Sequence, residues 1–401
     1  MRTVLFACVA GVLIVATPAQ TTHLVGAGGL PQIRDALAIA SPGDVILVQP
    51  GLYAHFAATV GVTIRALVPG TVDVEYQAAF SPPGCLTNQF CAAFQGPTQL
   101  IAPAGQTVHV VGLRFLPNVV PALVPNIFVR HRVAVSSGRA TFDECELRAT
   151  DMSALMIQNA TAHLEGCTVE VLGTAINGYG MIATNAMVTA IDTTFAGNST
   201  QVAFNLPGEG IRLQGSSLHG SNLTVTGGSA LPSGTGGVAV RADGSSSLWI
   251  SDSTLTGGTN GCPLVAPGAM GRITRSVLSP VIATCASLPP GPLLGVERPS
   301  PLLIGALFTL DHRTEPNAFV AIFASPDITS LAVPLLEQPL YLSPATAFSA
   351  TLVLADPTGF ASASWFIPAV PAFVDQRLWF QSVSGLALPL QASPVAGGVV
   401  R

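Results

Sequence analysis

Lysine is absent from this chain of 401 residues, and charged residues of every kind are scarce. All 16 basic residues are arginines, and charged residues make up 9% of the sequence, against roughly 25% in ordinary soluble domains. Without lysine, the chain has no lysine general base and cannot form a lysine Schiff base. The arginines are scattered, so the sequence also lacks the basic stripe that nucleic-acid binding needs, and we expect no nucleic-acid partner.

Apolar runs long enough to span a membrane are missing as well. The run from Val4 to Ala16 follows Met1-Arg2 and precedes Thr17-Pro18-Ala19. It is shorter than the ~20 residues that a membrane helix needs. A positive start, an apolar stretch and a small-x-small end are typical of a secretory signal peptide. We therefore expect residues 1–19 to be removed, which leaves a secreted or cell-surface protein without a membrane span.

Metal-binding motifs are missing too. The sequence has no CxxC, and no histidine lies at ligand spacing from a cysteine, so we expect no metal site and no cofactor. Beyond the expected signal peptide six cysteines remain, and an even number in an exported protein predicts disulfides. Among the many possible pairings, neighbours in sequence are the pairs that we favour: Cys85–Cys91, Cys145–Cys167 and Cys262–Cys285.

Hydrophobic residues, glycine and proline are abundant instead. Hydrophobic residues make up 49% of the chain, which contains 40 glycines and 32 prolines. A sheet-rich protein can cover its surface with Thr, Ser, Asn and Gly rather than with charge, so this composition favours an all-β fold.

Short strand-like segments recur along most of the chain, spaced by 22 to 32 residues. Repeats of strict length, such as ankyrin repeats, do not vary in this way, whereas the coils of a parallel β-helix do when loops enlarge them. The segments can be aligned on one small or apolar position each: Leu113, Cys145, Cys167, Thr193, Leu223, Ser253 and Ser276.

The aligned segments alternate with a period of two, which predicts strands with one buried face. Two residues after the alignment point lies an apolar column: Phe115, Leu147, Val169, Phe195, Val225, Leu255 and Leu278. Between the two columns lie residues expected to face outward: Glu146, Thr168, Thr194, Thr224 and Thr254. Polar or glycine residues, which suit a bend, precede the alignment point: Glu144, Gly166, Asp192, Asn222 and Asp252.

This alignment places Cys145 and Cys167 on the same rung of adjacent coils. They could form either a disulfide or a stack of two thiols, and we favour the disulfide.

The segment from Leu30 to Tyr53 resembles the N-terminal cap of the right-handed parallel β-helix, or pectin-lyase-like, superfamily. Members of that superfamily start with a short amphipathic helix, here Ile33 to Ala40, followed by Pro42-Gly43-Asp44 and an apolar strand from Val45 to Val48. Together with the repeats, the resemblance predicts a solenoid over residues 20–288. It implies a fold and not an activity, because the fold carries lyases, hydrolases, epimerases and adhesins.

The resemblance to polysaccharide lyases suggests a search for clustered carboxylates and an arginine base. The weak candidates are Arg130, Arg132, Glu144, Glu146 and Glu165. On stacked coils the three glutamates could form one patch, which would favour a cation or an arginine. The alternative, which we favour, is a solvated face of ion pairs. We also expect His109 and His163 to be surface residues, two coils apart.

After a linker over residues 289–300, residues 301–401 alternate strands with turns and predict a small β-sandwich. The expected strands are 302–310, 319–324, 349–354, 362–366 and 377–382. The stretches Ala361 to Pro368 and Arg377 to Gln381 resemble a C-terminal module that is common in exported proteins of planctomycete-type bacteria.

These observations predict a secreted or cell-surface β-helix protein that is a non-catalytic structural or glycan-binding element. A polysaccharide or cell-surface glycan is the expected partner, because the long flat side of a β-helix suits an extended polymer. Aromatics that could stack on sugars are few: Tyr179, Phe204 and Trp249. The alternative is a lyase or glycoside hydrolase acting on an acidic polysaccharide, with Ca²⁺ as the added ion if it is a lyase.

Overall fold

A computed structural model describes most of the chain after residue 19. The described ranges are 20–75, 98–117, 131–150, 153–172, 178–199, 207–230, 234–280, 285, 288–289, 293–296, 302–370, 373–374 and 376–400. The expected signal peptide (residues 1–19), Cys85, Cys91, Arg130 and Phe204 lie outside these ranges.

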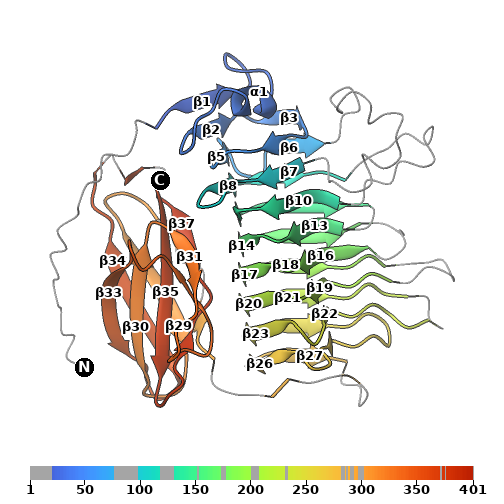
Figure 1. Cartoon of the computed structure of the whole chain (residues 1–401), viewed down its shortest axis with the longest axis vertical. Helices are drawn as coiled ribbons and strands as arrows, with labels where there is room; N and C mark the ends of the chain where they lie inside the picture. Colours follow the sequence, from blue (N-terminus) through green and yellow to red (C-terminus); the bar gives the residue numbers. More distant parts are fainter. Residues whose placement is uncertain are drawn as a thin grey trace.

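Three long parallel sheets form a right-handed parallel β-helix (Figure 1), as the repeats predicted. Each coil from β2 to β25 contributes one strand to each sheet, and the strands of neighbouring coils pair with each other. Sheet A contains β1 (Thr22–Val25), β2 (Val45–Val48), β5 (Thr63–Ala66), β8 (Thr107–Val111), β11 (Arg139–Asp143), β14 (Thr161–Glu165), β17 (Met187–Ile191), β20 (Ser217–Ser221), β23 (Ser247–Ser251) and β26 (Met270–Thr274).

The other two sheets complete the coils. Sheet B contains β3 (Gly51–Ala54), β6 (Val72–Glu75), β9 (Leu113–Phe115), β12 (Glu146–Ala149), β15 (Thr168–Val171), β18 (Thr194–Ala196), β21 (Thr224–Thr226), β24 (Thr254–Thr256) and β27 (Val277–Ser279). Sheet C contains β4 (Ala57–Ala58), β7 (Thr98–Ile101), β10 (His131–Ser137), β13 (Ser153–Gln158), β16 (Tyr179–Thr184), β19 (Ile211–Gln214), β22 (Val240–Ala242) and β25 (Leu264–Val265).

The columns read from the sequence have the predicted directions. The apolar column from Phe115 to Leu255 is buried in the core of the solenoid, and the outward column beside it is at least partly exposed. The bend between sheets A and B has positive φ in every coil from β8 to β26, at Gly112, Glu144, Gly166, Asp192, Asn222, Asp252 and Arg275. Glycine, asparagine and aspartate tolerate this left-handed conformation best, which is why they dominate the bend.

A short helix, α1 (Ile33–Leu37), lies at the N-terminal end of the solenoid (Figure 1), as the cap resemblance predicted. Its Ile33 and Ala36 are buried against the first coils. Asp44 closes the following turn, because its carboxylate accepts hydrogen bonds from the backbone N–H groups of Thr21 and Ser41. That helix covers the apolar end of the solenoid core.

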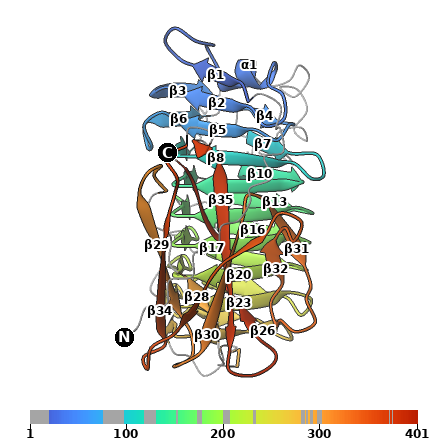
Figure 2. The same ribbon diagram turned by 90° about the vertical axis from the view of Figure 1, so that its left-hand side faces the viewer.

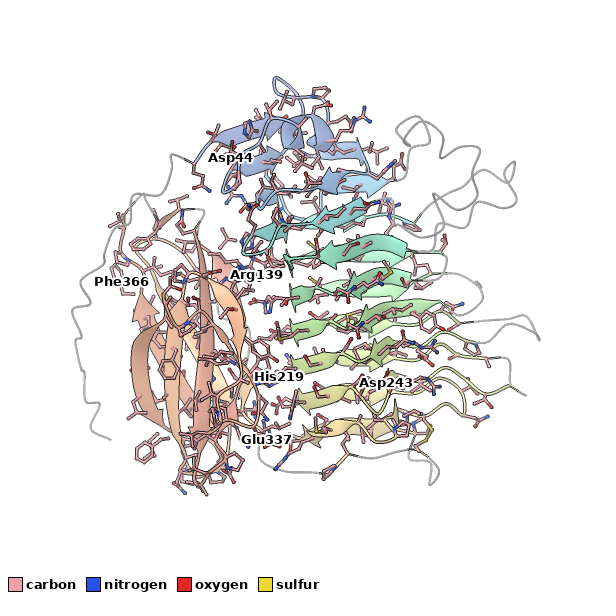
Figure 3. The ribbon with its side chains drawn as sticks, in the orientation of Figure 1. Asp44, Arg139, His219, Asp243, Glu337 and Phe366 are labelled. Carbon is pink, nitrogen blue, oxygen red and sulfur yellow. A yellow bond between two sulfur atoms is a disulfide. The ribbon has the colours of Figure 1, made fainter. Side chains whose placement is uncertain are left out.

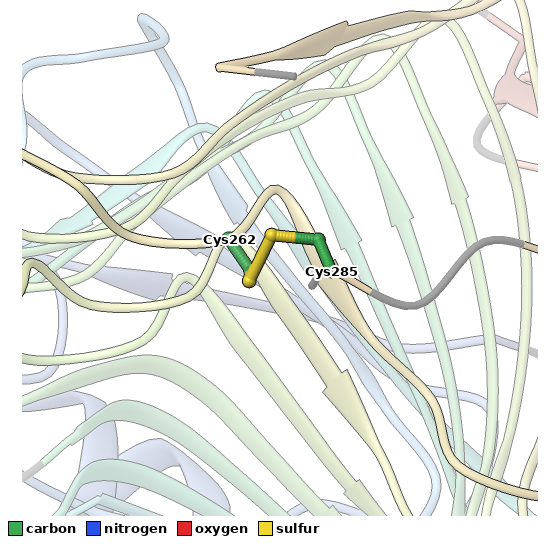
Figure 4. Close-up of a disulfide and its surroundings, with 2 residues drawn as sticks. All are labelled: Cys262 and Cys285. Atoms are coloured by element: carbon green, nitrogen blue, oxygen red, sulfur yellow. A yellow bond between two sulfur atoms is a disulfide. The ribbon is translucent and has the colours of Figure 1, made fainter. Parts of the chain in front are cut away.

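Of the predicted cysteine pairs that the structure describes, one forms a disulfide and one does not. Cys262 and Cys285 form the expected disulfide at the last coil (Figure 4), with their Cα atoms 5.5 Å apart. The favoured Cys145–Cys167 disulfide was wrong, since both residues are free and buried. They do occupy the same rung, but stacked side chains of parallel strands point in the same direction rather than toward each other. Each thiol instead lies 3.3–3.4 Å from backbone carbonyl oxygens, such as those of Val110 and Phe142.

The C-terminal residues 293–400, here called the C-terminal module, form a small antiparallel sandwich. One sheet contains β28 (Gly295–Val296), β29 (Leu307–Arg313) and β34 (Phe360–Phe366). The other contains β33 (Phe348–Leu354), β30 (Phe319–Ser325), β35 (Arg377–Gly385), β36 (Gln391–Ala392) and β37 (Ala396–Val399). A separate hairpin pairs β31 (Ile328–Leu331) with β32 (Leu340–Leu342). The expected linker thus includes β28, which pairs with β29.

The C-terminal module does not extend away from the solenoid but lies along sheet A (Figures 1 and 2). Figure 2 shows β35 running along the solenoid axis, across the strands of sheet A. Among the described residues, no helix is long and apolar enough to cross a membrane.

Candidate functional site

The outer face of sheet A presents one residue per coil in a central column. In register from β8 to β23, this histidine column contains His109, Thr141, His163, Thr189, His219 and Trp249. The expectation that His109 and His163 are surface residues was wrong for His163 and is confirmed in part for His109. The C-terminal module covers them, so that His163 and His219 are fully buried and His109 is half-buried.

A cluster of ionisable groups, here called the junction cluster, is enclosed between β11, β14 and β35. It contains Asp143, His163, Glu165 and Arg377, each no more than 6% exposed. His163 Nε2 lies 3.2 Å from Glu165 Oε2, and the same oxygen accepts a hydrogen bond of 3.0 Å from the Gly397 N–H of the module. The module is therefore hydrogen-bonded to a buried carboxylate of the solenoid.

Arg377 is the cation of the junction cluster. Its guanidinium lies 3.8 Å from the Asp143 carboxylate and stacks 4.3 Å above the ring of Trp379. The edge of that ring faces His163, with the ring centroids 4.7 Å apart. Within the described part of the chain, none of the three guanidinium nitrogens has a hydrogen-bond partner. A buried charge without hydrogen bonds is costly, so this contact is incompletely satisfied.

Burial keeps the covered histidines neutral. Desolvation, assisted by Arg377 and Arg139, lowers the pKa of His109 to about 3. Desolvation alone lowers the pKa of His219 to about 3. The pKa of His163 is well below its usual value, because burial and Arg377 outweigh the opposing effect of Asp143.

Of the four predicted site residues that the structure describes, only Glu165 belongs to the junction cluster. Glu144 lies in the bend between sheets A and B, and Glu146 lies on the outer face of sheet B. Arg132 is buried, donates a hydrogen bond to the carbonyl oxygen of Val74, and has its pKa lowered by desolvation to about 10. Arg130 lies outside the described residues. The predicted patch of three glutamates is therefore not formed, because the bend sends Glu146 and Glu165 to different faces.

Ion pairs occupy sheet B where that patch was expected. Arg148 lies 2.8 Å from Glu170 and 3.5 Å from Glu146, and all three side chains are partly exposed. This is the solvated ion-pair face that we favoured, and exposed pairs of this kind contribute little to stability.

A second group of residues lies on the outer face of sheet C, which the module does not cover. Arg212 and Arg241 are partners on the adjacent strands β19 and β22. Glu209 lies between them, with its side chain 7% exposed, and accepts hydrogen bonds from both guanidinium groups. Arg212 also stacks 4.4 Å above the ring of Tyr179, so that this ring is covered and not available for sugar stacking. We call Glu209, Arg212 and Arg241 the arginine pair site.

A shallow hollow of about 390 Å³ adjoins the arginine pair site, lined by Arg212, Leu213, Gln214, Arg241, Ala242, Asp243, Val265 and Pro267. Figure 3 shows Asp243 on the side of the solenoid away from the module, whereas His219 and Glu337 lie between the solenoid and the module. Sequence reasoning missed this site. Its signal was the similarity of Ile211-Arg212-Leu213 and Val240-Arg241-Ala242, one coil apart.

The described residues contain no group of three or more His, Cys, Asp or Glu side chains placed to hold a metal ion. The other expected sugar-stacking residue, Trp249, belongs to the histidine column and is 9% exposed, beside His219.

No family model matches the sequence, and no curated protein matches it. Among solved structures, the fold is similar to the pectin methylesterase from Aspergillus niger in deglycosylated form. The identity is 10%, the match covers 68% of this chain and 91% of that chain, and the TM-score is 0.38. The fold described above rests on the strand order of the three sheets and not on this likeness.

Proposed function

We propose that the protein is a non-catalytic glycan-binding protein of the cell exterior and that it binds an extended glycan along the outer face of sheet C. The observation that carries this proposal is the hollow beside the arginine pair site, on a face that the C-terminal module leaves open. The exterior location is supported by the Cys262–Cys285 disulfide, because such bonds persist in oxidising compartments.

The outer face of sheet C repeats polar groups from coil to coil. Gln158, Thr184 and Gln214 follow each other in register, and the Thr184 hydroxyl lies 3.2 Å from the Gln214 amide oxygen. Beside them runs a second column: Met156, Ile182, Arg212, Arg241 and Val265. A polymer lying across the strands would meet a polar side chain of the first column about every 4.8 Å, and the two arginines of the second column at the same spacing.

The hollow combines the two kinds of contact that sugars need. Val265 and Pro267 offer apolar surface to a ring face, while Arg241 and Gln214 can donate to ring hydroxyls. Asp243 offers acceptors, and hydrogen bonds from Ser246, Gly215 and Ser245 lower the pKa of its carboxyl, which keeps it ionised at neutral pH. Glu209 and Asp243 balance the two arginines, so the charge of the site does not restrict it to acidic sugars.

Binding of the chain from residue 20 to neutral and acidic polysaccharides, measured by isothermal titration calorimetry, tests this proposal. Arg241→Ala should weaken binding about tenfold or more, because a hydrogen bond from a charged group contributes roughly 1.5–3 kcal/mol. Thr254→Ala, on the exposed face of sheet B, is the matched control and should leave affinity unchanged. Equal affinity of the Arg241→Ala protein and the unsubstituted protein would refute the proposed site, and no binding across the panel would refute glycan binding.

The alternative, a lyase or hydrolase, draws on the junction cluster. Two carboxylates, a histidine and an arginine meet there, which is a set of groups that acid–base catalysis uses. The C-terminal module encloses all of them, so a substrate has no access in this arrangement. New reducing ends that form with the unsubstituted protein, vanish with Glu165→Gln and persist with Glu146→Gln would establish the enzyme and overturn our choice.

A further inference from the structure

Three histidines of sheet A support the C-terminal module at alternate coils of the junction. The rings of Trp379 and His163 are perpendicular, with their centroids 4.7 Å apart, and the centroid of the Trp379 ring is 6.5 Å from that of His109. The ring of Tyr341, from β32, lies 5.9 Å from His219. The contact therefore depends on aromatic side chains of the module that pack against uncharged imidazoles.

The junction is incompletely packed and incompletely hydrogen-bonded. A cleft of about 450 Å³ opens at its N-terminal end, where His109, Asp327, Gln376 and Arg377 are among the lining residues. A second cavity of about 240 Å³ is bordered by residues of both parts, including Arg139 and Tyr341. Within the described residues, several buried polar atoms of the junction lack hydrogen bonds: His219 Nδ1, Trp249 Nε1, Tyr341 Oη and the Arg377 nitrogens. Water would satisfy each of these atoms if the two parts separated.

From this arrangement we propose that the C-terminal module is a releasable cover, which acid detaches from sheet A to expose the histidine column as a second polar binding face. The proposal concerns sheet A and is independent of glycan binding on sheet C. The face that would be uncovered presents His109, His163, His219 and Trp249 together with the carboxylates Asp143 and Glu165.

The direction of the pH effect follows from the histidines. Detached and solvated, each should have a pKa near 6.5, whereas in the docked state the values for His109 and His219 are about 3. Between about pH 3 and pH 6.5, these histidines therefore bind protons more strongly in the detached state than in the docked state. Docking is unaffected above pH 6.5 and is weakened as the pH falls below it. At pH 4.5 His109 and His219 should each favour detachment by about 100-fold relative to neutral pH, and His163 should act in the same direction.

The charged groups around the histidines modify this effect without reversing it. Arg377 and Arg139 face His109 and oppose its protonation in the docked state. Glu165 lies 3.2 Å from His163, and Asp143 favours protonation of His163, but burial and Arg377 outweigh the effect of Asp143. The aromatic neighbours of His219, Trp249 and Tyr341, bring no charge, because burial raises the pKa of Tyr341.

Another histidine lies within the module itself. His312 is buried beside the Ser382 hydroxyl, and its pKa is lowered to about 4. Acid could therefore also destabilise the module internally. His312→Gln is the matched control, because it removes a buried histidine from the module and none from the histidine column.

Small-angle X-ray scattering from pH 7.5 to 4.5, with circular dichroism on the same samples, tests the proposal. We expect a reversible increase in the radius of gyration below pH 6 with unchanged secondary structure. In the variant with His163→Gln and His219→Gln, the change in the ratio of detached to docked protein over this range should be smaller by at least about 100-fold, the factor expected for His219 alone. His312→Gln should retain the full response. A radius independent of pH, an equal response in the double variant, or expansion only with loss of secondary structure would each overturn the proposal.

A titration of the unsubstituted protein keeps the proposal testable if the double variant does not fold. Nuclear magnetic resonance should show His109, His163 and His219 neutral in the docked protein down to the pH at which the module detaches. Histidines of the column that titrate near pH 6.5 while the module stays docked would overturn the proposal.

Discussion

Trp379 is the side chain that most clearly joins the C-terminal module to the solenoid. It is 1% exposed and belongs to a buried cluster with Tyr341, Leu342 and Val395 of the module, against which Met187 of sheet A packs. Truncating a buried tryptophan to alanine costs roughly 3–5 kcal/mol. Part of this free energy comes from the contact between the rings of Trp379 and His163, which joins the module to the solenoid. Aromatic contacts of this kind contribute about 0.5–1.5 kcal/mol beyond burial.

Trp379→Ala should therefore loosen docking as well as the module. With the apolar surface that Trp379 buries at the junction added to the His163 contact, we expect a loss of about 1–3 kcal/mol at the junction. The ratio of detached to docked protein should rise about 5- to 150-fold. Limited proteolysis between residues 280 and 302, together with the radius of gyration at pH 7.5, measures this change.

Phe380→Ala is the matched control, because neighbouring residues of a strand face opposite sides. Phe380 is buried inside the sandwich, with its ring 5.1 Å from that of Phe308 and 5.7 Å from that of Trp365. Its truncation should lower the stability of the module by a similar ~3–5 kcal/mol without a specific effect on docking. If the two variants behave alike at pH 7.5, or if the Trp379 variant keeps its docked dimensions and its resistance to proteolysis, the reasoning about this junction is wrong.

Further predictions concern the solenoid. Phe195→Ala should destabilise it by about 3–5 kcal/mol in urea unfolding, because the side chain is buried. Thr194→Ala, on the outward side of the same strand, should change the stability by less than about 0.5 kcal/mol. Equal effects of the two substitutions would contradict the inward and outward directions assigned to these side chains. Reduction of Cys262–Cys285, which closes a loop of 23 residues, should cost about 3 kcal/mol, and an unchanged unfolding midpoint would argue against the bond. Cys167 should resist thiol reagents until the protein unfolds, because burial raises the pKa of its thiol; rapid labelling of the native protein would contradict its burial.

The repeats could be predicted from the sequence because each coil repeats the same local physics. A period of two separates the buried column of Phe195 from the outward column of Thr194, and the left-handed bend selects residues such as Asp192 and Asn222. These requirements act within a few residues of one another, so they leave a readable pattern. Five strands of the C-terminal module, β29, β30, β33, β34 and β35, were predictable for the same reason. The short strands β31, β32, β36 and β37 were not expected, and β28 fell within the expected linker.

The docking of the module could not be predicted in this way. A period-two pattern distinguishes inward from outward residues. It does not show whether the outward face lies in water or beneath another domain, and a histidine such as His163 is compatible with either environment. The available signal was the presence of Ile191 and Trp249 at outward positions of sheet A, where an exposed strand would favour polar residues. The Cys145–Cys167 prediction failed because it used position alone, and a shared rung does not set the direction of the side chains.

The contacts of the C-terminal module also bear on how many coils the solenoid can have. Trp379 contacts β14, Tyr341 contacts β20, and Glu337 lies 2.7 Å from Arg272 of β26, so the contacts of the module are spread along the coils of this stretch. Solenoids ordinarily gain or lose repeats with little penalty, because each repeat contacts only its neighbours. Here one inserted coil would displace the later contacts by about 4.8 Å, roughly the spacing of adjacent strands. The contacts of the module therefore fix the number of coils between β14 and β26. Insertions in this stretch should occur in loops and should not add whole coils.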